Sequence, residues 1–86
     1  MPSISRFFGI VIYMYYDDHF PAHFHAIYGE YRTQIDLETL EILEGELPRR
    51  ALSLVIEWAV MHRNELRQNW LYAREGLPLQ DIAPLE

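Results

Sequence analysis

The chain has 86 residues, no cysteine, and 13 acidic against 7 basic side chains, which gives a net charge of −6. This length indicates one domain with a thin core, and no apolar stretch approaches the ~20 residues of a membrane span. The acidic balance disfavours direct binding to nucleic acid, because affinity for a phosphate backbone comes mainly from cationic side chains. The absence of cysteine fits a reducing compartment, so a cytoplasmic protein without membrane contact is expected.

The first half of the chain is predicted to form a small antiparallel β-meander of three to four strands. A β-branched and aromatic run at residues 8–16 predicts the first strand. Two more runs, 23–28 and 31–36, flank a two-residue loop that begins at Gly29. A loop that opens with glycine favours a hairpin with a type II′ turn. A short fourth strand is expected at Leu40–Leu43.

The hairpin predicts which side chains share a face of the sheet, because successive residues of a strand point to opposite sides. The apolar face toward the core is expected to carry the pairs Tyr28 with Tyr31, Ala26 with Thr33, and Phe24 with Ile35. The opposite, solvent-facing side is expected to carry His25 with Gln34, His23 with Asp36, and Ile27 with Arg32. A slip of one residue would exchange the two faces.

The second half of the chain is predicted to form one long helix. Between Pro48 and Gly76 there is no proline or glycine, so a helix over Arg49–Glu75 is expected. A straight helix of that length would be about 40 Å long, which exceeds a globule of this size. The helix must therefore overhang, bend or meet a partner, and Arg63-Asn64 is the expected place for a bend. The expected fold class is therefore α+β, with a single domain over residues 1–86.

The predicted helix has two apolar sides. One stripe at helical spacing is expected to pack on the sheet. The second side is read either as further packing within the domain or as a protein-interaction surface, and it carries Leu54, Trp58 and Met61. The apolar tail after Gly76 is expected to lie along the domain.

Three histidines and two aspartates lie within the nine residues 17–25. Imidazole and carboxylate are the usual donors for zinc, manganese or nickel, so a divalent metal site is a candidate function of this cluster. The candidate metal ligands are Asp17, His19, His23, His25 and Asp36. The alternative is that these side chains only cap a loop.

The same face offers candidate catalytic residues, namely His23, His25 and Asp36. His23 and His25 are two apart on a strand and are expected to point to the same side. Asp36, opposite His23, is a candidate ligand or the acceptor that orients its imidazole as a general base. No serine or cysteine nucleophile lies nearby in the sequence, so an enzymatic activity is left open.

Several segments together resemble the bacterial domain-of-unknown-function family DUF4160 over nearly the whole chain. They are residues 1–9, the His19-x-Pro21-x-His23-Phe24-His25 element, residues 35–41 and 43–48, and Trp58 with Trp70. The gene of this family often lies beside one for a DUF2442 protein, and the pair is described as a toxin–antitoxin module. The resemblance therefore implies a protein partner, but no reaction and no certain cofactor. The family usually has Pro-Pro before the histidine pair, where this chain has Pro21-Ala22.

Three hypotheses of function follow from these observations. The leading hypothesis is a protein-interaction component of a two-gene toxin–antitoxin-like module, as toxin or as antitoxin. The second is a metal-dependent or His/Asp-dependent hydrolase or nuclease that uses the histidine-rich face. The third is a homo-oligomer without catalytic activity, in which Trp58 and Met61 are buried between copies.

Overall fold

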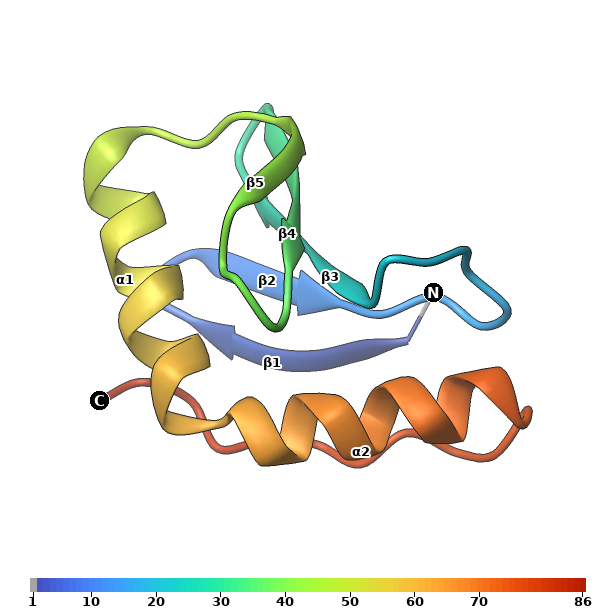
Figure 1. Cartoon of the computed structure of the whole chain (residues 1–86). Coiled ribbons are helices and arrows are strands. Elements are labelled where there is room, and N and C mark those ends of the chain that lie inside the picture. Colours follow the sequence, from blue (N-terminus) through green and yellow to red (C-terminus); the bar gives the residue numbers. More distant parts are fainter. Residues whose placement is uncertain (1) are drawn as a thin grey trace.

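The computed structural model describes residues 2–86, which form a five-stranded antiparallel sheet followed by two helices (Figure 1). The spatial order of the strands follows the chain, so the sheet is a meander. The α+β class is confirmed, but the sheet has one strand more than the upper limit of the prediction. The strands are β1 (Ser3–Phe7), β2 (Ile10–Tyr13), β3 (His23–Tyr28), β4 (Tyr31–Asp36) and β5 (Ile42–Gly45).

The strand predicted for residues 8–16 begins too early, because its first two residues form the turn of a hairpin. Phe8 and Gly9 have φ values of 49° and 80° and form a two-residue turn between β1 and β2. β1 was missed because only Ile4 and Phe7 face the core, while Ser3, Ser5 and Arg6 give the segment a polar composition.

The hairpin of β3 and β4 has the predicted register, with Tyr28 opposite Tyr31 and His23 opposite Asp36. Gly29 alone in its two-residue loop has a positive φ, as a type II′ turn requires. The fourth predicted strand begins two residues too early. Leu40 has a φ of 63° and donates its N–H to the carbonyl of Asp36, so it belongs to the turn before β5.

The single predicted helix is two helices, α1 (Arg49–Met61) and α2 (Arg63–Arg74). The helical conformation ends at His62, whose φ and ψ are −123° and 25°, one residue before the predicted bend. The longest dimension of the domain is 33 Å, which is shorter than the predicted straight helix. The change of direction lets Trp58 of α1 and Leu66 of α2 enter the same core.

The core lies between the helices and the sheet face that carries Phe24 and Ile35. Trp58 is 0% exposed and packs on Phe7 and Phe24, so it is not at a surface as predicted. Leu54 is half-buried against the core, and Met61 is 64% exposed. Of the three residues of the predicted interaction surface, only Met61 is open to solvent.

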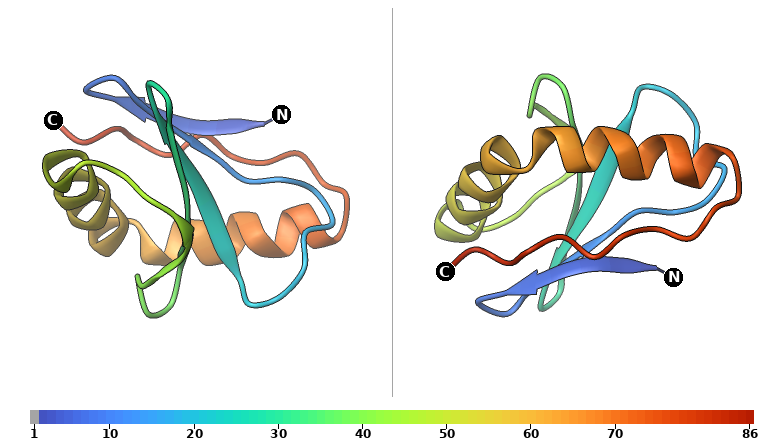
Figure 2. Two further views of the ribbon diagram at one scale, coloured as in Figure 1. Left: turned by 90° about the horizontal axis from the view of Figure 1, so that it is seen from above. Right: turned by 90° about the horizontal axis from the view of Figure 1, so that it is seen from below.

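The segment after α2 runs back beside β1, as the view in Figure 2 shows and as its apolar composition predicts. Ile82 donates its N–H to the carbonyl of Ile4 at 2.7 Å, and the indole N–H of Trp58 donates to Ala83 at 2.9 Å. The side chain of Asn69 exchanges two hydrogen bonds with the backbone of Gln80. The C-terminal segment thereby covers the β1 edge of the sheet.

Within residues 2–86, neither helix has the length and apolar character needed to cross a membrane. The cytoplasmic location stays a prediction.

Candidate functional site

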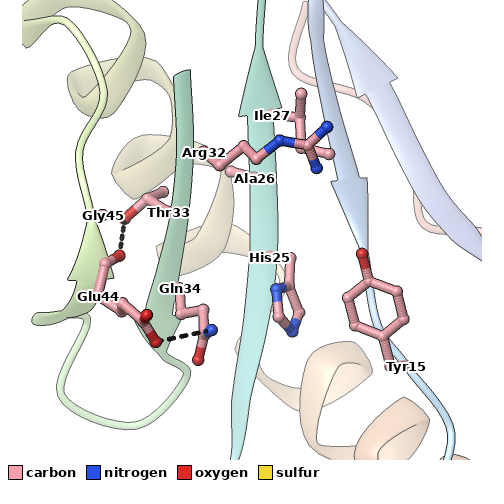
Figure 3. Close-up of a pocket in the computed structure, with 9 residues that line it drawn as sticks. All are labelled: Tyr15, His25, Ala26, Ile27, Arg32, Thr33, Gln34, Glu44 and Gly45. Carbon is pink, nitrogen blue, oxygen red and sulfur yellow. Dashed lines mark hydrogen bonds between the residues drawn. The ribbon is translucent and has the colours of Figure 1, made fainter. Parts of the chain in front are cut away.

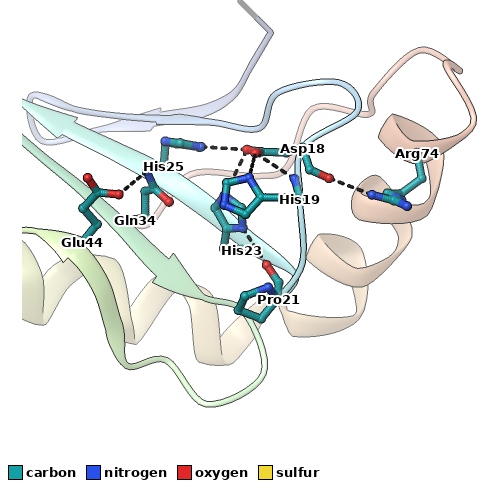
Figure 4. A network of polar contacts seen from close by, with 8 residues as sticks. All are labelled: Asp18, His19, Pro21, His23, His25, Gln34, Glu44 and Arg74. Atoms are coloured by element: carbon teal, nitrogen blue, oxygen red, sulfur yellow. Dashed lines mark hydrogen bonds and ion pairs between the residues drawn. The ribbon is translucent and has the colours of Figure 1, made fainter.

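The loop between β2 and β3 folds over the start of β3 and brings Asp18 against the histidines of that strand (Figure 4). The last turn of α2 holds this loop in place. Arg74 donates from Nη1 to the carbonyl of Asp18 at 2.7 Å, and its guanidinium lies 4.5 Å from the centre of the Phe20 ring. Phe20 in turn packs edge-on against Trp70, at 5.7 Å between ring centres. The position of Asp18 therefore depends on contacts with α2.

Asp18, His23 and His25 form one cluster of potential ligand atoms. Asp18 Oδ2 lies 3.0 Å from His23 Nε2 and 3.2 Å from His25 Nε2. All three ligand atoms are within 4.8 Å of one another. The structure thus brings together the two histidines that alternation along β3 places on one side, and it adds a carboxylate from the preceding loop.

His23 is 1% exposed and packs against Trp70, so it does not lie on the solvent-facing surface as predicted. Its Nδ1–H donates to the carbonyl of Pro21 at 2.7 Å, which leaves a lone pair on Nε2 in the neutral ring. Although Nε2 is close to Asp18, the two atoms are not aligned as a hydrogen bond, and this buried nitrogen has no hydrogen-bond partner. In the neutral ring a buried lone pair would face a carboxylate oxygen, and either a proton or a cation at this position would remove the repulsion between them.

Electrostatics keep the cluster ready to bind a cation near neutral pH. Burial lowers the pKa of His25 and outweighs its hydrogen bond to Asp18, which acts in the opposite direction. Burial would raise the pKa of Asp18, but hydrogen bonds from His25 and from the backbone N–H of His19 outweigh it and lower that pKa. At pH 7 the site thus contains a carboxylate and a neutral His25 imidazole.

The other predicted ligands lie outside this group. Asp36 stands opposite His23 in the register, but its Oδ1 accepts the backbone N–H groups of Glu38 and Thr39 and so caps the turn. The side chain of His19 is 81% exposed and lies 3.1 Å from the other oxygen of Asp18. Asp17 is exposed, with a φ of 58°.

The predicted ligand set therefore contains Asp17, whereas the structure places Asp18 beside the histidines. Nothing in the local pattern distinguishes two adjacent aspartates in a loop. The choice is made by α2, because Asp17 donates its N–H to Ala73 while Arg74 holds the carbonyl of Asp18. A contact between residues so distant along the chain leaves no signal in a single sequence.

Residues 9–71 of the chain match the family described as a domain of unknown function, DUF4160. The chain belongs to the DUF4160 family. The resemblance inferred from sequence is confirmed, and the matched region contains Asp18, His23 and His25. No curated protein and no solved structure is matched by this chain.

In this DUF4160 domain a groove of about 240 Å³ opens beside the cluster, over the sheet face that carries His25 (Figure 3). His25 lies in its wall and is contacted by the edge of Tyr15, at 4.3 Å between ring centres. Gln34 donates to the carboxylate of Glu44 at 3.1 Å within the same groove. The full lining is Tyr15, His25, Ala26, Ile27, Arg32, Thr33, Gln34, Glu44 and Gly45.

Glycine at position 45 allows β5 to form the far wall of this groove. A Cβ atom there would lie 2.1 Å from the carbonyl oxygen of Arg32, which is far inside van der Waals contact. Gly45 also has a φ of 78°, which other residues rarely adopt. The close approach of β5 to β4, and with it the place of Glu44 in the groove, therefore requires this glycine.

Proposed function

We propose that this domain binds one divalent transition-metal ion, zinc first, through Asp18, His23 and His25. The observation that carries the proposal is His23 Nε2, a buried ring nitrogen without a hydrogen-bond partner that lies 3.0 Å from a carboxylate oxygen of Asp18. The hydrogen bond from His23 Nδ1 to a backbone carbonyl adds support, because metal-binding histidines typically donate their other N–H in this way.

Two imidazoles and one carboxylate form the donor set typical of a catalytic zinc site, in which a fourth position is left for water. Manganese prefers more oxygen donors, and nickel prefers square or octahedral surroundings, so zinc fits this set best. A bound zinc ion lowers the pKa of its water to near 7 and supplies a nucleophile for hydrolysis. The function that we infer is therefore metal-dependent hydrolysis at the groove beside His25.

Calorimetric titration of zinc into protein stripped with a chelator tests the proposal. We expect one ion per chain, and we expect His23→Gln to weaken binding by more than the about 10–100-fold that loss of a supporting residue costs. His62→Gln is the matched control, because His62 pairs with Glu65 on the helices and lies outside the cluster. Circular dichroism verifies that each variant is folded.

Equal zinc affinity of the unmodified protein and the folded His23→Gln variant would overturn this proposal. The proposal would also be overturned if His62→Gln lowered the number of zinc ions bound per chain as much as His23→Gln does. Such a result would indicate nonspecific binding to histidines. The titration can also be repeated with manganese and nickel, and we expect zinc to displace manganese.

A second candidate function is a protein-interaction component of a two-gene toxin–antitoxin-like module. The observation that favours it is the β5 edge of the described sheet, where Ile42 and Leu43 are both exposed and Met61 of α1 is open as well. The test is co-expression with the product of the neighbouring gene. We expect the two chains to co-purify and Leu43→Glu to separate them.

Separate elution of the two chains, with unchanged solubility and growth, would count against a partner of this kind. Sedimentation of the chain alone then distinguishes the third hypothesis. A homodimer broken by Leu43→Glu would assign the β5 edge to self-association, and a monomer would exclude it.

A further inference from the structure

We infer that the groove beside the cluster binds a small molecule with a phosphate group, which Arg32 and the bound metal ion contact from two sides. This inference rests on the metal binding proposed above and specifies the class of ligand. Its basis is the placement of one free guanidinium and one metal ligand on the same wall of the same groove.

His25 and Arg32 are close neighbours across β3 and β4. His25 is paired with Gln34, and Arg32 lies two residues further along β4, so both side chains share one face of the sheet. Diagonal neighbours of this kind are about 7–8 Å apart at their Cα atoms. Both residues line the groove, and Figure 3 shows them on adjacent strands with Tyr15 opposite. A single small anion can therefore contact both groups.

Arg32 is exposed and makes no ion pair with any residue from 2 to 86. Other arginines of the domain are engaged, for example Arg67 with Glu38 and Arg74 with Asp18. Arg32 is also the one arginine in the lining of the groove. The planar guanidinium binds phosphate through two parallel hydrogen bonds, and such charge-assisted pairs are among the stronger contacts in proteins.

The charges in and beside the groove make anion binding depend on the metal. Glu44 and Arg32 line the groove, and Asp18 lies outside the lining, against His25. Without an ion, the two carboxylates exceed the guanidinium by one negative charge. A divalent cation reverses this to one positive charge. The empty site therefore repels phosphate, and the loaded site attracts it. By linkage, phosphate must raise the affinity for the metal by the same factor.

The size of the groove limits the ligand. Its volume of about 240 Å³ lies below the roughly 300–1,000 Å³ of pockets that take drug-sized ligands. The net charge of −6 opposes a long polyanion such as a nucleic-acid strand. A small phosphate monoester satisfies both limits.

The experiment follows phenyl phosphate binding by NMR, with zinc-loaded and chelator-treated protein. We expect binding to the loaded protein and a loss of about tenfold or more without zinc. Arg32→Gln should lose a similar factor, the scale of one charge-assisted hydrogen bond. Glu44→Gln should bind more tightly, because it removes the negative charge nearest the anion. Arg49→Gln carries the same charge change on α1, away from the groove, and should bind as the unmodified protein does.

The results separate this inference from the proposed function. If zinc does not bind, the metal site itself fails, and the inference fails with it. If zinc binds with the proposed ligands but Arg32→Gln and Arg49→Gln hold phenyl phosphate equally well, only the inference is overturned. Equal binding of phenylacetate would also overturn it, since the site would then accept any small anion.

Discussion

The loop before β3 and the turn after β4 each place an aspartate at the same end of the sheet, yet the two carboxylates have different roles. Asp36 is paired directly with His23, but one of its oxygens accepts two backbone N–H groups of its own turn. Asp18 accepts only one backbone N–H, from His19, and its oxygens otherwise lie beside imidazoles.

This difference shows that an aspartate followed by unpaired backbone N–H groups accepts hydrogen bonds from them and caps the turn. It does so even when a histidine lies opposite it on the neighbouring strand. In the loop, the contacts of Asp17 and Asp18 with α2 hold the chain so that the Asp18 side chain faces the histidines. Chain geometry therefore decides which carboxylate is available to a ligand, and proximity in the register does not.

The largest effect is expected from exchanging the two aspartates one at a time for asparagine. Asp18→Asn should weaken zinc binding by more than about 100-fold, because it removes a charged ligand. Asp36→Asn should leave the zinc affinity nearly unchanged and cost about 1 kcal/mol of stability, because it weakens the hydrogen bonds of the turn. Calorimetry measures the first quantity and urea unfolding the second. Equal losses of zinc affinity would show that the two carboxylates are not distinct in function.

A smaller effect is expected from the residue that holds the loop. Arg74→Ala removes both the hydrogen bond to Asp18 and the stacking on Phe20, and should weaken zinc binding by about 10-fold. Arg74→Lys should recover part of that loss. Cobalt absorption spectra provide the specific measurement, since a displaced Asp18 changes the ligand geometry while a merely less stable fold does not. Identical spectra and affinities in all three proteins would contradict the role of α2.

The pH dependence of the metal-free protein offers a third comparison. The pKa of His25 is lowered from its ordinary 6.5, so the unfolded chain takes up a proton before the folded chain does. Stability should therefore fall as the pH drops below about 6.5. It should fall again below 3.8, since the pKa of Asp18 is lowered as well. Urea unfolding across pH measures this dependence. The loss of stability below about pH 6.5 should be present in Asp36→Asn, which keeps His25, and absent in His25→Asn.

The smallest effect on stability is expected from removing the ion pair between Arg67 and Glu38, at the surface of the turn after β4. Arg67 binds the carboxylate of Glu38 with two hydrogen bonds of 2.7 Å, and this contact lowers the pKa of Glu38. Both side chains are solvated, so Arg67→Ala should leave the urea midpoint almost unchanged. A large shift would show that this ion pair holds the turn, in place of the Asp36 carboxylate.

Sequence reasoning predicted the features that depend on neighbours in the chain. The glycine-led loop gave the register of β3 and β4, and with it the shared face of His23 and His25. The predictions were incomplete where residues far apart in the chain pack against one another. The side of the helix with Trp58 was left between internal packing and an interaction surface, because helical spacing alone does not show that Ala83 and Phe7 contact this residue. The break between α1 and α2 was predicted near Arg63 from the length of the helix, since no proline or glycine marks it, and the structure places it at His62.

The candidate site divides in the same way. The sequence placed His23 and His25 on one side of β3, as the structure shows, whereas the carboxylate beside them was expected from Asp36 or Asp17 and comes from Asp18. The burial of His23 under Trp70 was also missed, since the two residues are far apart in the chain. Arg32 was grouped with His25 on one face, but only the structure shows the groove that they share.

The C-terminal segment also has a consequence for the order of folding. Trp58 obtains its hydrogen-bond partner from Ala83, and Ile4 obtains its own from Ile82, so both contacts join residues that are far apart in the chain. The sheet edge at β1 and the indole stay uncovered until that segment docks. Contacts between such distant residues carry the cost of closing a long loop, so this segment is expected to dock after the hairpins of the sheet have formed.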